Sequence, residues 1–585
     1  MNTSDSKMIT KMFFRLLPIQ ILLVAISSLN SIIDGAVASN LIGPDAMAAT
    51  GLYAPYSRIL ETINGVLLGG SQILCGQFLG KNQVERTKGI FTLDIITISI
   101  ISVTASVFSL LFPSAIGFLM GSDELLMDGL CEYIRGIAIG FPAFLISTQL
   151  TAFLQLEQQE KRTYFGIGLM LVSNLLLDLL LVGTLDLGLF GLGLATSISN
   201  IIFVIVLGLY YINKKAIIQL DIKSISLADL KDIIRIGLPN ATVQVCLTIR
   251  GITLNSIMLS SIGSNGLSAY TALNTFGGVF YATTAGVASA TRLLISVYIG
   301  EEDRTGLIQI MKTAVFKGVS LVAGVAAVII ALCVPLTCIF FRESAGEVYE
   351  LTKWGFILFP VSMPLSCFSV VFANYYQCFG KLSINTVLSI FDGVIGMVGS
   401  ALLLTPVFGM MGIWYAQITN GIITTAVIFI YAIIKNRKPV SSFEELLTLP
   451  AEFGIDEKSR LDITIRSLEN VVNTSENIEQ FCLAHGIDRR RSMFAALCME
   501  EMSGNIVKHG FNNKRHSIDA RVVYMNNELL LRLKDDCRAF NPREAAELFS
   551  PEDITHNIGI RMVSKMAKSM TYQNTLGLNV LTIRL

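Results

Sequence analysis

Three polar residues lie inside long apolar segments, where each side chain needs a partner or a task. Asp34 lies in the segment 12–38, and Asn174 and Asp178 lie in the segment 164–183. A carboxylate inside a membrane span costs on the order of 3 kcal/mol on insertion scales. Two carboxylates and an amide can hold Na⁺ through hard oxygen ligands, or share a proton between neighbouring like charges. The alternative is that hydrogen bonds between packed helices satisfy these side chains.

A second group of polar residues lies near the C-terminus. The segment EEMSGNIVKH places Glu501 and Asn505 four residues apart, on one face of a helix. The segment KDDCRAFNP contains Asp535, and HNIGIRMVSKMAK contains Gly559 just before a predicted helix. A glycine turn at that point can direct backbone N–H groups toward a phosphate.

The two groups lie in parts of the chain with different composition. The 434 residues before Lys435 carry 47 charges and no histidine, whereas the last 151 carry 41 charges and all four histidines. An apolar run of about 20 residues crosses the roughly 30 Å hydrocarbon layer as a helix. We predict twelve membrane spans, at residues 12–38, 52–77, 90–112, 131–155, 164–183, 191–212, 236–260, 270–296, 312–338, 352–378, 384–405 and 411–434.

The membrane part contains an internal repeat of about 220 residues. The segment beginning at Gly65 returns at Gly286, and each is a long helix followed by a charged loop. The Ile42-Gly43 and Ile262-Gly263 turns are also 220 positions apart. Six helices per repeat give both halves the same orientation, which is a common design of secondary transporters with a cavity between two bundles.

Basic residues indicate the orientation, because Lys and Arg accumulate in cytoplasmic loops. One set of loops holds fourteen basic residues, and the other set holds only Arg342 among many acids. We therefore expect a multi-pass plasma-membrane protein, in contact with lipid, with both termini in the cytoplasm. The basic residues of the first set are Lys81, Arg86, Lys88, Lys161, Arg162, Lys214, Lys215, Lys223, Lys231, Arg235, Arg304, Lys312, Lys317 and Lys381.

The membrane part resembles the multidrug and toxic compound extrusion (MATE) family over about residues 10–435. The matching segments are NSIIDGAVASNLIGPDAMAATG, NLLLD, GLGLATSIS and GLPNATVQV. The resemblance implies twelve helices in two lobes and export of organic, often cationic, compounds driven by protons or sodium. One branch of the family has an aspartate in helix 1 and an Asn-x-x-x-Asp in helix 5 as its cation site, which here correspond to Asp34, Asn174 and Asp178.

The second half does not repeat this group of acids. Displacing Asp178 by 221 positions leads to Gly399, so we assign no second cation site. Asp392 in helix 11 is either a satisfied interior acid or a cavity residue. Asp94 lies near a span end, and we expect it to reach the interface. Without histidine, carboxylates are the expected proton carriers.

The C-terminal segment alternates helical and strand patterns. Residues 489–509 have an amphipathic helical pattern, and LLLRLKDD and NVLTIRL have strand patterns. We expect an α+β domain of about 130 residues. The three motifs above resemble the ATP-binding (Bergerat-type) domain of the anti-sigma-factor serine kinases, in the histidine-kinase and Hsp90-type ATPase superfamily.

The resemblance assigns a role to each motif. It implies that Asn505 holds Mg²⁺, that Glu501 is the general base for a substrate serine, that Asp535 binds adenine and that Gly559 lies at the phosphates, with ATP and Mg²⁺ as cofactors. Two positions depart from the family pattern, because Cys537 and Asn557 replace glycines.

The expected organisation is an N-terminal six-helix lobe (1–215), a second lobe (216–434), a linker (435–454) and the kinase-like domain (455–585). The leading hypothesis is a proton- or sodium-coupled antiporter for organic or drug-like compounds with an ATP-binding regulatory domain. One alternative is a membrane-anchored serine-protein kinase that acts on an anti-anti-sigma-like partner. Another is a lipid-linked oligosaccharide flippase, whose basic cavity would rely on Arg250 and Arg292. No nucleic-acid partner is expected.

Overall fold

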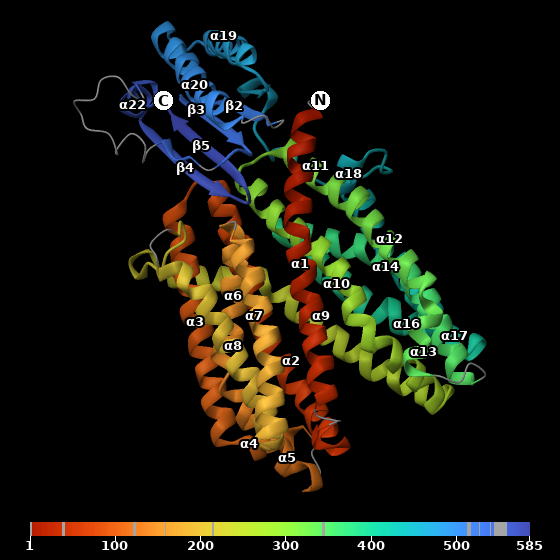
Figure 1. The fold of residues 1–585 in the computed structure, drawn as a ribbon. Coiled ribbons are helices and arrows are strands. Elements are labelled where there is room, and N and C mark those ends of the chain that lie inside the picture. Colours follow the sequence, from red (N-terminus) through yellow and green to blue (C-terminus); the bar gives the residue numbers. More distant parts are fainter. Residues whose placement is uncertain are drawn as a thin grey trace.

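The computed structural model describes residues 3–37, 41–120, 124–157, 159–212, 216–341, 346–511, 516–525, 527–538, 540–542 and 558–585. It consists of two helical bundles and a C-terminal α+β domain at one end of them (Figure 1). Eleven of the described helices are long and apolar enough to cross a membrane, and the number is twelve when the pair α5 and α6, bent by 48°, is counted as one span. This agrees with the twelve spans predicted.

The N lobe contains the first six spans. Its helices are α1 (Thr3–Val37), α2 (Pro44–Gly80), α3 (Val84–Leu111), α4 (Pro113–Leu119), α5 (Glu124–Ala138), α6 (Phe141–Leu156), α7 (Glu160–Asp178), the π-helix η2 (Leu179–Thr184) and α8 (Gly188–Ile212). The bend between α5 and α6 falls at Ile139 and Gly140, just before Pro142 in the first turn of α6, and the proline ring cannot continue a helix from the preceding turn.

The C lobe contains the other six spans. Its elements are η3 (Ile222–Ser224), α9 (Leu227–Ser261), α10 (Ser264–Gly300), α11 (Arg304–Lys312), η4 (Thr313–Gly318), α12 (Val319–Ala331), α13 (Cys333–Phe340), α14 (Glu347–Cys378), α15 (Leu382–Ile390), η5 (Phe391–Ile395), α16 (Gly396–Phe408) and α17 (Met410–Asn436). The segments α11–η4–α12 and α15–η5–α16 each form one span.

The internal repeat is visible in the backbone. Gly43 and Gly263 precede α2 and α10, and both have positive φ, 137° and 90°. At the other ends of these helices, Asn82 (φ 59°) and Glu302 (φ 53°) occupy equivalent places in three-residue turns. The two lobes therefore use the same turns at both ends of their second helix.

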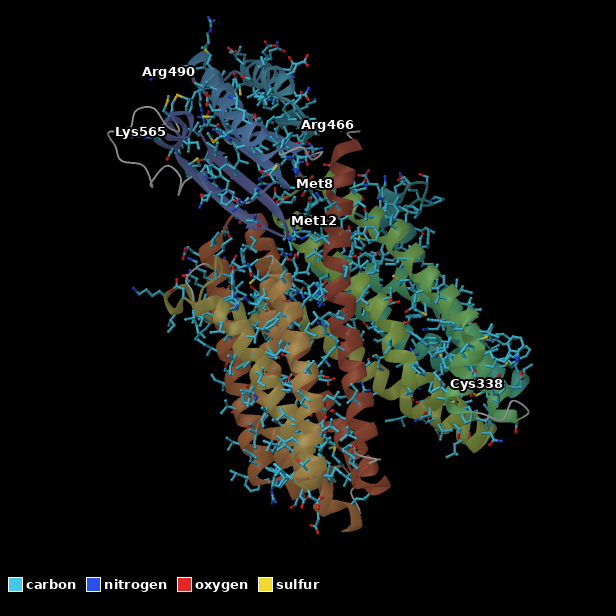
Figure 2. All side chains as sticks on the ribbon, in the orientation of Figure 1. Met8, Met12, Cys338, Arg466, Arg490 and Lys565 are labelled. Atoms are coloured by element: carbon cyan, nitrogen blue, oxygen red, sulfur yellow. The ribbon has the colours of Figure 1, made fainter. Side chains whose placement is uncertain are left out.

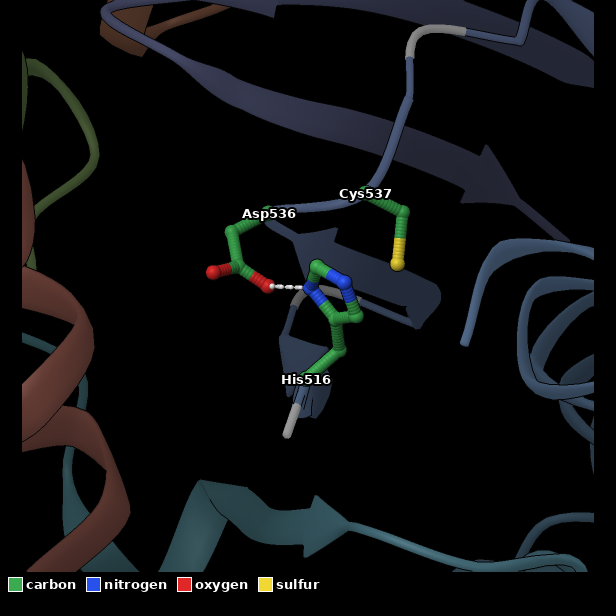
Figure 3. A group of neighbouring side chains, drawn as sticks. All are labelled: His516, Asp536 and Cys537. Atoms are coloured by element: carbon green, nitrogen blue, oxygen red, sulfur yellow. Dashed lines mark hydrogen bonds and ion pairs between the residues drawn. The ribbon is translucent and has the colours of Figure 1, made fainter. Parts of the chain in front are cut away.

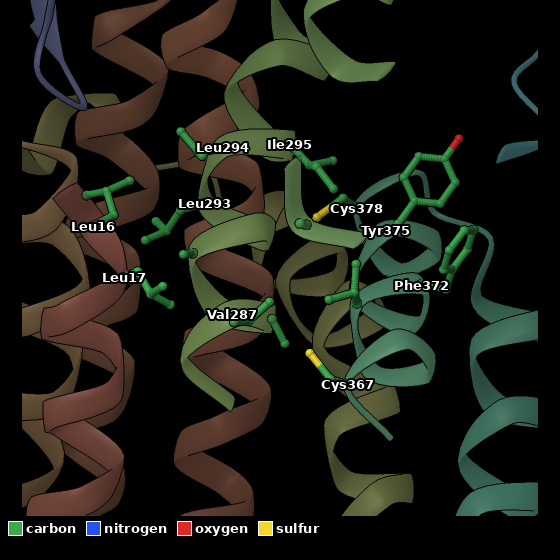
Figure 4. Close-up of a cluster of buried hydrophobic side chains, with 14 of the residues drawn as sticks. Leu16, Leu17, Val287, Leu293, Leu294, Ile295, Cys367, Phe372, Tyr375 and Cys378 are labelled. Carbon is green, nitrogen blue, oxygen red and sulfur yellow. The ribbon is translucent and has the colours of Figure 1, made fainter. Parts of the chain in front are cut away.

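The core between the lobes is centred on α10. Leu16 and Leu17 of α1 lie on one side of Val287 and Leu293 of α10, and Phe372 of α14 lies on the other (Figure 4). All five side chains are buried. Since α1 begins the N lobe, α10 joins the two bundles through apolar contacts.

The α+β domain, called here the tail domain, follows α18 (Phe443–Leu447). It contains η6 (Glu457–Ser459), β1 (Arg460–Ile465), α19 (Leu468–Ala484), α20 (Arg489–Gly510), β2 (Ile518–Met525), β3 (Glu528–Asp535), α22 (Ile558–Met566), β4 (Ser569–Thr575) and β5 (Leu578–Arg584). The helix predicted over 489–509 and the strands predicted from Leu529 and Asn579 are present as α20, β3 and β5.

The tail sheet is antiparallel, in the order β1-β2-β3-β5-β4. One face is apolar and packs on the helices through side chains such as Val522, Leu531 and Ile583. The other face points toward the ends of the bundles (Figure 1). We call the side of the bundles on which this domain lies the tail side.

Candidate functional site

The predicted cation-site residues lie together in the N lobe. Asp178 is the last residue of α7 and comes directly before the π-helix η2, and Asn174 lies one turn earlier. Both side chains are buried, with exposed fractions of 0 % and 1 %. Asp34 of α1 interacts electrostatically with Asp178, so the two carboxylates lie near each other. π-helical turns occur frequently at functional sites.

Several polar atoms of this group have no partner. Both carboxylate oxygens of Asp178, Oδ1 of Asp34 and Nδ2 of Asn174 are buried without a hydrogen bond to any residue that the structure describes. Buried polar groups are normally hydrogen-bonded, and a buried ionised carboxylate without a partner is costly. The arrangement can therefore take up a proton or a cation.

Two further side chains complete the group. The hydroxyl of Thr196 in α8 lies within hydrogen-bonding reach of the Asp34 carboxylate. The buried ring of Tyr133 in α5 lies close enough to Asp34 and Asp178 to interact with both charges. Neither residue was singled out from the sequence. Hydroxyl groups are common in spans, and only the packing of α5 and α8 brings these two to the acids.

The position of Asp94 corrects one prediction. We expected this residue to reach the interface, but its side chain is 0 % exposed, and neither carboxylate oxygen has a hydrogen-bond partner in the described part of the chain. Ser71 and Cys75 of α2 lie beside it. The reason is that α2 covers this face of α3, which the distance from the end of the span does not indicate.

In the C lobe, Asp392 lies in the π-helix η5 and accepts a hydrogen bond from Nδ2 of Asn420 at 2.9 Å. Of the two interpretations left open, this contact favours a satisfied interior acid. Arg250 of α9 donates to Gln417 at 3.3 Å, whereas Arg292 belongs to α10. The two arginines that a flippase would use thus lie on different helices.

The four predicted nucleotide-site residues lie on the helix-covered side of the tail sheet. A Cβ atom at Gly559 of α22 would lie 2.1 Å from Oε2 of Glu501 in α20, so the first and third motifs are in contact. A Cβ atom at Gly510, at the end of α20, would lie 2.9 Å from Sγ of Cys537. The C-terminal half of α20, which includes Asn505, therefore lies between the other two motifs.

Asp535 ends β3 and is 3 % exposed. Its Oδ1 accepts hydrogen bonds from Nδ2 of Asn579 at 2.8 Å and from the N–H of Cys537 at 2.9 Å. Burial raises the pKa of this carboxyl group, and these hydrogen bonds partly offset the effect. An acceptor held in this way fits an adenine amine, while the thiol of Cys537 occupies space that a glycine would leave open. Asn557 lies outside the described residues.

His516, Asp536 and Cys537 form a small cluster beside Asp535 (Figure 3). Their ligand atoms lie within 4.8 Å of one another, and these residue types can bind zinc. However, Oδ1 of Asp536 already contacts Nδ1 of His516 at 2.7 Å, and Oδ2 contacts Nζ of Lys11 at 2.5 Å. Burial would raise the pKa of Asp536, but these two partners outweigh it and hold the pKa below its usual range. The cluster is therefore a polar contact between the tail domain and α1.

Comparisons with known proteins concern the membrane part. The MatE family model matches residues 20–182 and 239–402, one segment in each lobe, which together make up more than half of the chain. The two segments begin about 220 residues apart, in agreement with the internal repeat.

Curated relatives carry the names of drug exporters. Probable multidrug resistance protein YoeA of Bacillus subtilis is 23% identical over 350 residues, covering 57% of this chain and 75% of the relative. Multidrug export protein MepA of Staphylococcus saprophyticus is 21% identical, covering 72% of this chain and 94% of the relative.

Solved structures show the same fold. An outward-facing multidrug resistance MATE family transporter has a TM-score of 0.68 at 22% identity, covering 72% of this chain and 95% of that chain. A MOP superfamily transporter from Pyrococcus furiosus has a TM-score of 0.65 at 20% identity, covering 74% and 99%. The tail domain lies outside the family match. The chain thus belongs to the MatE family of multi-pass membrane transporters.

Proposed function

We propose that this protein is an antiporter that exports organic, drug-like compounds in exchange for protons or sodium. The names of the relatives support the substrate class, because YoeA and MepA are described as multidrug resistance and export proteins. The basic loops on the tail side support placing both termini in the cytoplasm.

The observation that carries the coupling is the buried pair of acids, Asp34 and Asp178. Their unpartnered oxygens make the ionised, cation-free state costly. Proton or sodium binding removes that cost. The free energy gained on binding differs between two conformations of the protein if the packing of α1 against α7 differs between them. A ligand with such differential affinity shifts the conformational equilibrium.

The test is dye transport by the purified full chain in vesicles under an imposed proton or sodium gradient. Asp34→Asn should abolish gradient-driven movement. Asp186→Asn is the matched control, because Asp186 is an exposed acid that follows η2 in the same lobe. Gradient-driven transport that survives in Asp34→Asn would refute the assigned site.

We further propose that the tail domain binds Mg²⁺–ATP and regulates transport. The support is that the motifs of Asp535 and Gly559 both contact the C-terminal half of α20, which contains Asn505. Bound ATP would supply a triphosphate, Asn505 an oxygen ligand for Mg²⁺, and Asp535 an acceptor for the adenine amine. Binding of a fluorescent ATP analogue to the full chain should be lost in Asp535→Asn and kept in Glu476→Gln, which alters an exposed residue of α19.

A second candidate activity is phosphate transfer to a serine of a partner protein. It rests on the contact between the Glu501 carboxylate and Gly559, which puts a potential general base beside the predicted phosphate turn. Labelled phosphate should then appear on a serine-containing partner protein, and Glu501→Ala should remove this transfer while leaving ATP bound.

A further inference from the structure

We propose that the tail domain is a clamp that holds the two lobes together on the tail side, and that it must release the N lobe before the transporter can open there. The inference rests on the proposed transport function only in assuming that the protein alternates between open sides. The tail helices leave one face of the sheet uncovered, and this face lies against the bundles.

The face of the tail sheet that points toward the bundles carries apolar side chains that are buried against them. Its apolar side chains Leu576, Leu578 and Val580 are buried and belong to the same core as Met12 of α1 and Leu79 of α2. Figure 2 shows Met8 and Met12 at the start of α1, where it meets the tail domain. The contact is therefore continuous with the interior of the transporter.

The sheet binds the same turn in both lobes. In the N lobe, Asn82 of the α2–α3 turn donates to Oγ1 of Thr571, and Nε2 of Gln573 donates to the carbonyl of Leu79 at 3.0 Å. The N–H of Leu576 donates to the carbonyl of Leu156 at 3.4 Å. These three contacts are hydrogen bonds between uncharged groups. Lys11 of α1 adds an ion pair with Asp536, but the Lys11 side chain is 65 % exposed, and exposed ion pairs contribute little.

In the C lobe, the partner is the α10–α11 turn, the repeat equivalent of the α2–α3 turn. Asp303 pairs with Arg521 at 3.1 Å, and Glu301 pairs with Lys534, whose ammonium lies 4.6 Å from the ring centroid of Tyr298. The carboxylate side chains are only 9 % and 4 % exposed. Burial would raise the pKa of Asp303, but Arg521 and Lys534 outweigh it and hold the pKa well below its usual range.

The linker fixes the tail domain to the C lobe as well. Tyr375 of α14 donates to the carbonyl of Leu447 at 2.8 Å, and Arg304 binds Glu444 and the carbonyl of Pro450. The linker is also a covalent attachment whose Leu446 and Leu447 are buried, and charge-assisted hydrogen bonds are stronger than neutral ones. The C-lobe attachment is thus the permanent one, and the N-lobe attachment is the one that can open.

The clamp lies where the lobes meet. A Cβ atom at Gly80 of α2 would lie 2.1 Å from the carbonyl oxygen of Val297, and one at Gly76 would lie 2.0 Å from Oγ of Ser296. The helices α2 and α10 are therefore in backbone contact on the tail side, while the bundles diverge toward the opposite side (Figure 1). To open the tail side, these helices must separate, and the sheet that binds both turns opposes the separation.

The test measures exposure of the contact between the lobes. Ser296→Cys places a thiol between α2 and α10, and labelling at residue 296 by a membrane-impermeant maleimide is followed by peptide mass spectrometry in the full chain. Thr571→Val with Gln573→Met removes two N-lobe hydrogen bonds at nearly constant volume, and labelling should become about tenfold faster. Gln480→Met on the exposed face of α19 should leave the rate unchanged.

A second experiment locks the tail domain onto the N lobe with a disulfide. A disulfide between Asn82→Cys and Thr571→Cys should stop labelling at residue 296, and reduction should restore it. The melting temperature of each variant checks that it folds. Unchanged labelling in the Thr571→Val, Gln573→Met chain, or unslowed labelling in the cross-linked chain, would overturn the clamp. Since no gradient or dye is involved, failure of the proposed antiport would leave this readout intact.

Discussion

At the scale of single residues, packing leaves some of the interior carboxylates without partners. Asp178 is 0 % exposed, and no described residue donates a hydrogen bond to it. Asp392, which was equally conspicuous in the sequence, accepts a hydrogen bond from Asn420. Whether an interior acid has a hydrogen-bond partner thus depends on the neighbouring helix rather than on the depth in the membrane.

Cation binding at Asp34 and Asp178 should stabilise the folded protein, because only the folded state brings the two acids together. The melting temperature in detergent should rise with added NaCl relative to KCl if sodium is the ion, or with falling pH if it is the proton. Asp178→Asn should lose the increase and Asp186→Asn should keep it. An equal increase in Asp178→Asn would contradict the assignment.

ATP binding should depend on the ionisation of Asp535. Because burial raises its pKa, the carboxylate that we propose as the acceptor for the adenine amine protonates at a higher pH than an ordinary aspartate does. Affinity for a fluorescent ATP analogue should therefore fall as the pH is lowered through that raised pKa. An affinity for the ATP analogue that stays constant down to about pH 4 would show that Asp535 does not bind the adenine.

At the scale of elements, glycines set how closely α2 and α10 approach. A Cβ atom at Gly300 would lie 2.0 Å from the carbonyl oxygen of Gln77, whereas one at Gly324 in α12 would meet no atom within 4 Å. Helices with small residues at their interface can bring their backbones into contact. The glycines of α2 and α10 therefore allow the close backbone contact on the tail side.

Gly300→Ala should destabilise the protein by about 1–3 kcal/mol, because the added methyl group overpacks a backbone contact. Gly324→Ala should be neutral or slightly stabilising, since alanine favours the helix and the space is open. Thermal unfolding of the two variants in the same detergent makes the comparison. Equal melting temperatures would contradict the close packing of Gly300 against Gln77.

At the scale of the whole molecule, the tail domain belongs to the architecture of the transporter. Its sheet has two buried faces, one against its own helices and one against the bundles. Lys534 and Asp535 are consecutive in β3, and the first pairs with Glu301 while the second lies at the predicted adenine position. A ligand on the helix side is thus one residue away from the contact between the domains.

Asp303→Asn should weaken docking of the tail domain by about 1.5–3 kcal/mol, because Arg521 loses one of its two carboxylate partners and keeps Asp462. Cleavage of the tail domain by a protease should become faster, while Arg490→Gln, at the outer end of the domain, serves as control (Figure 2). The pKa of Asp303 is lowered in the folded state, so its stabilisation is complete above its unfolded value near 3.8 and is lost as the pH falls through the folded pKa. Cleavage that is insensitive to Asp303→Asn would exclude this role.

The sequence by itself determined the twelve spans, the repeat and the positions of α20, β3 and β5. These features depend on the length and period of apolar runs, which are local properties of the chain. It also indicated Asp34 and Asp178, because an acid within an apolar run is visible without its neighbours.

Only the tertiary structure decided which acids are satisfied and where the tail domain binds. Asp94 was misjudged because the helix that covers it, α2, is defined by packing and not by distance from a span end. Arg521 and Lys534 alternate with apolar residues along their strands, which in a sequence is also the pattern of a solvent-exposed face. Their partners, Asp303 and Glu301, lie more than 200 positions away, and no local pattern encodes a contact of that separation.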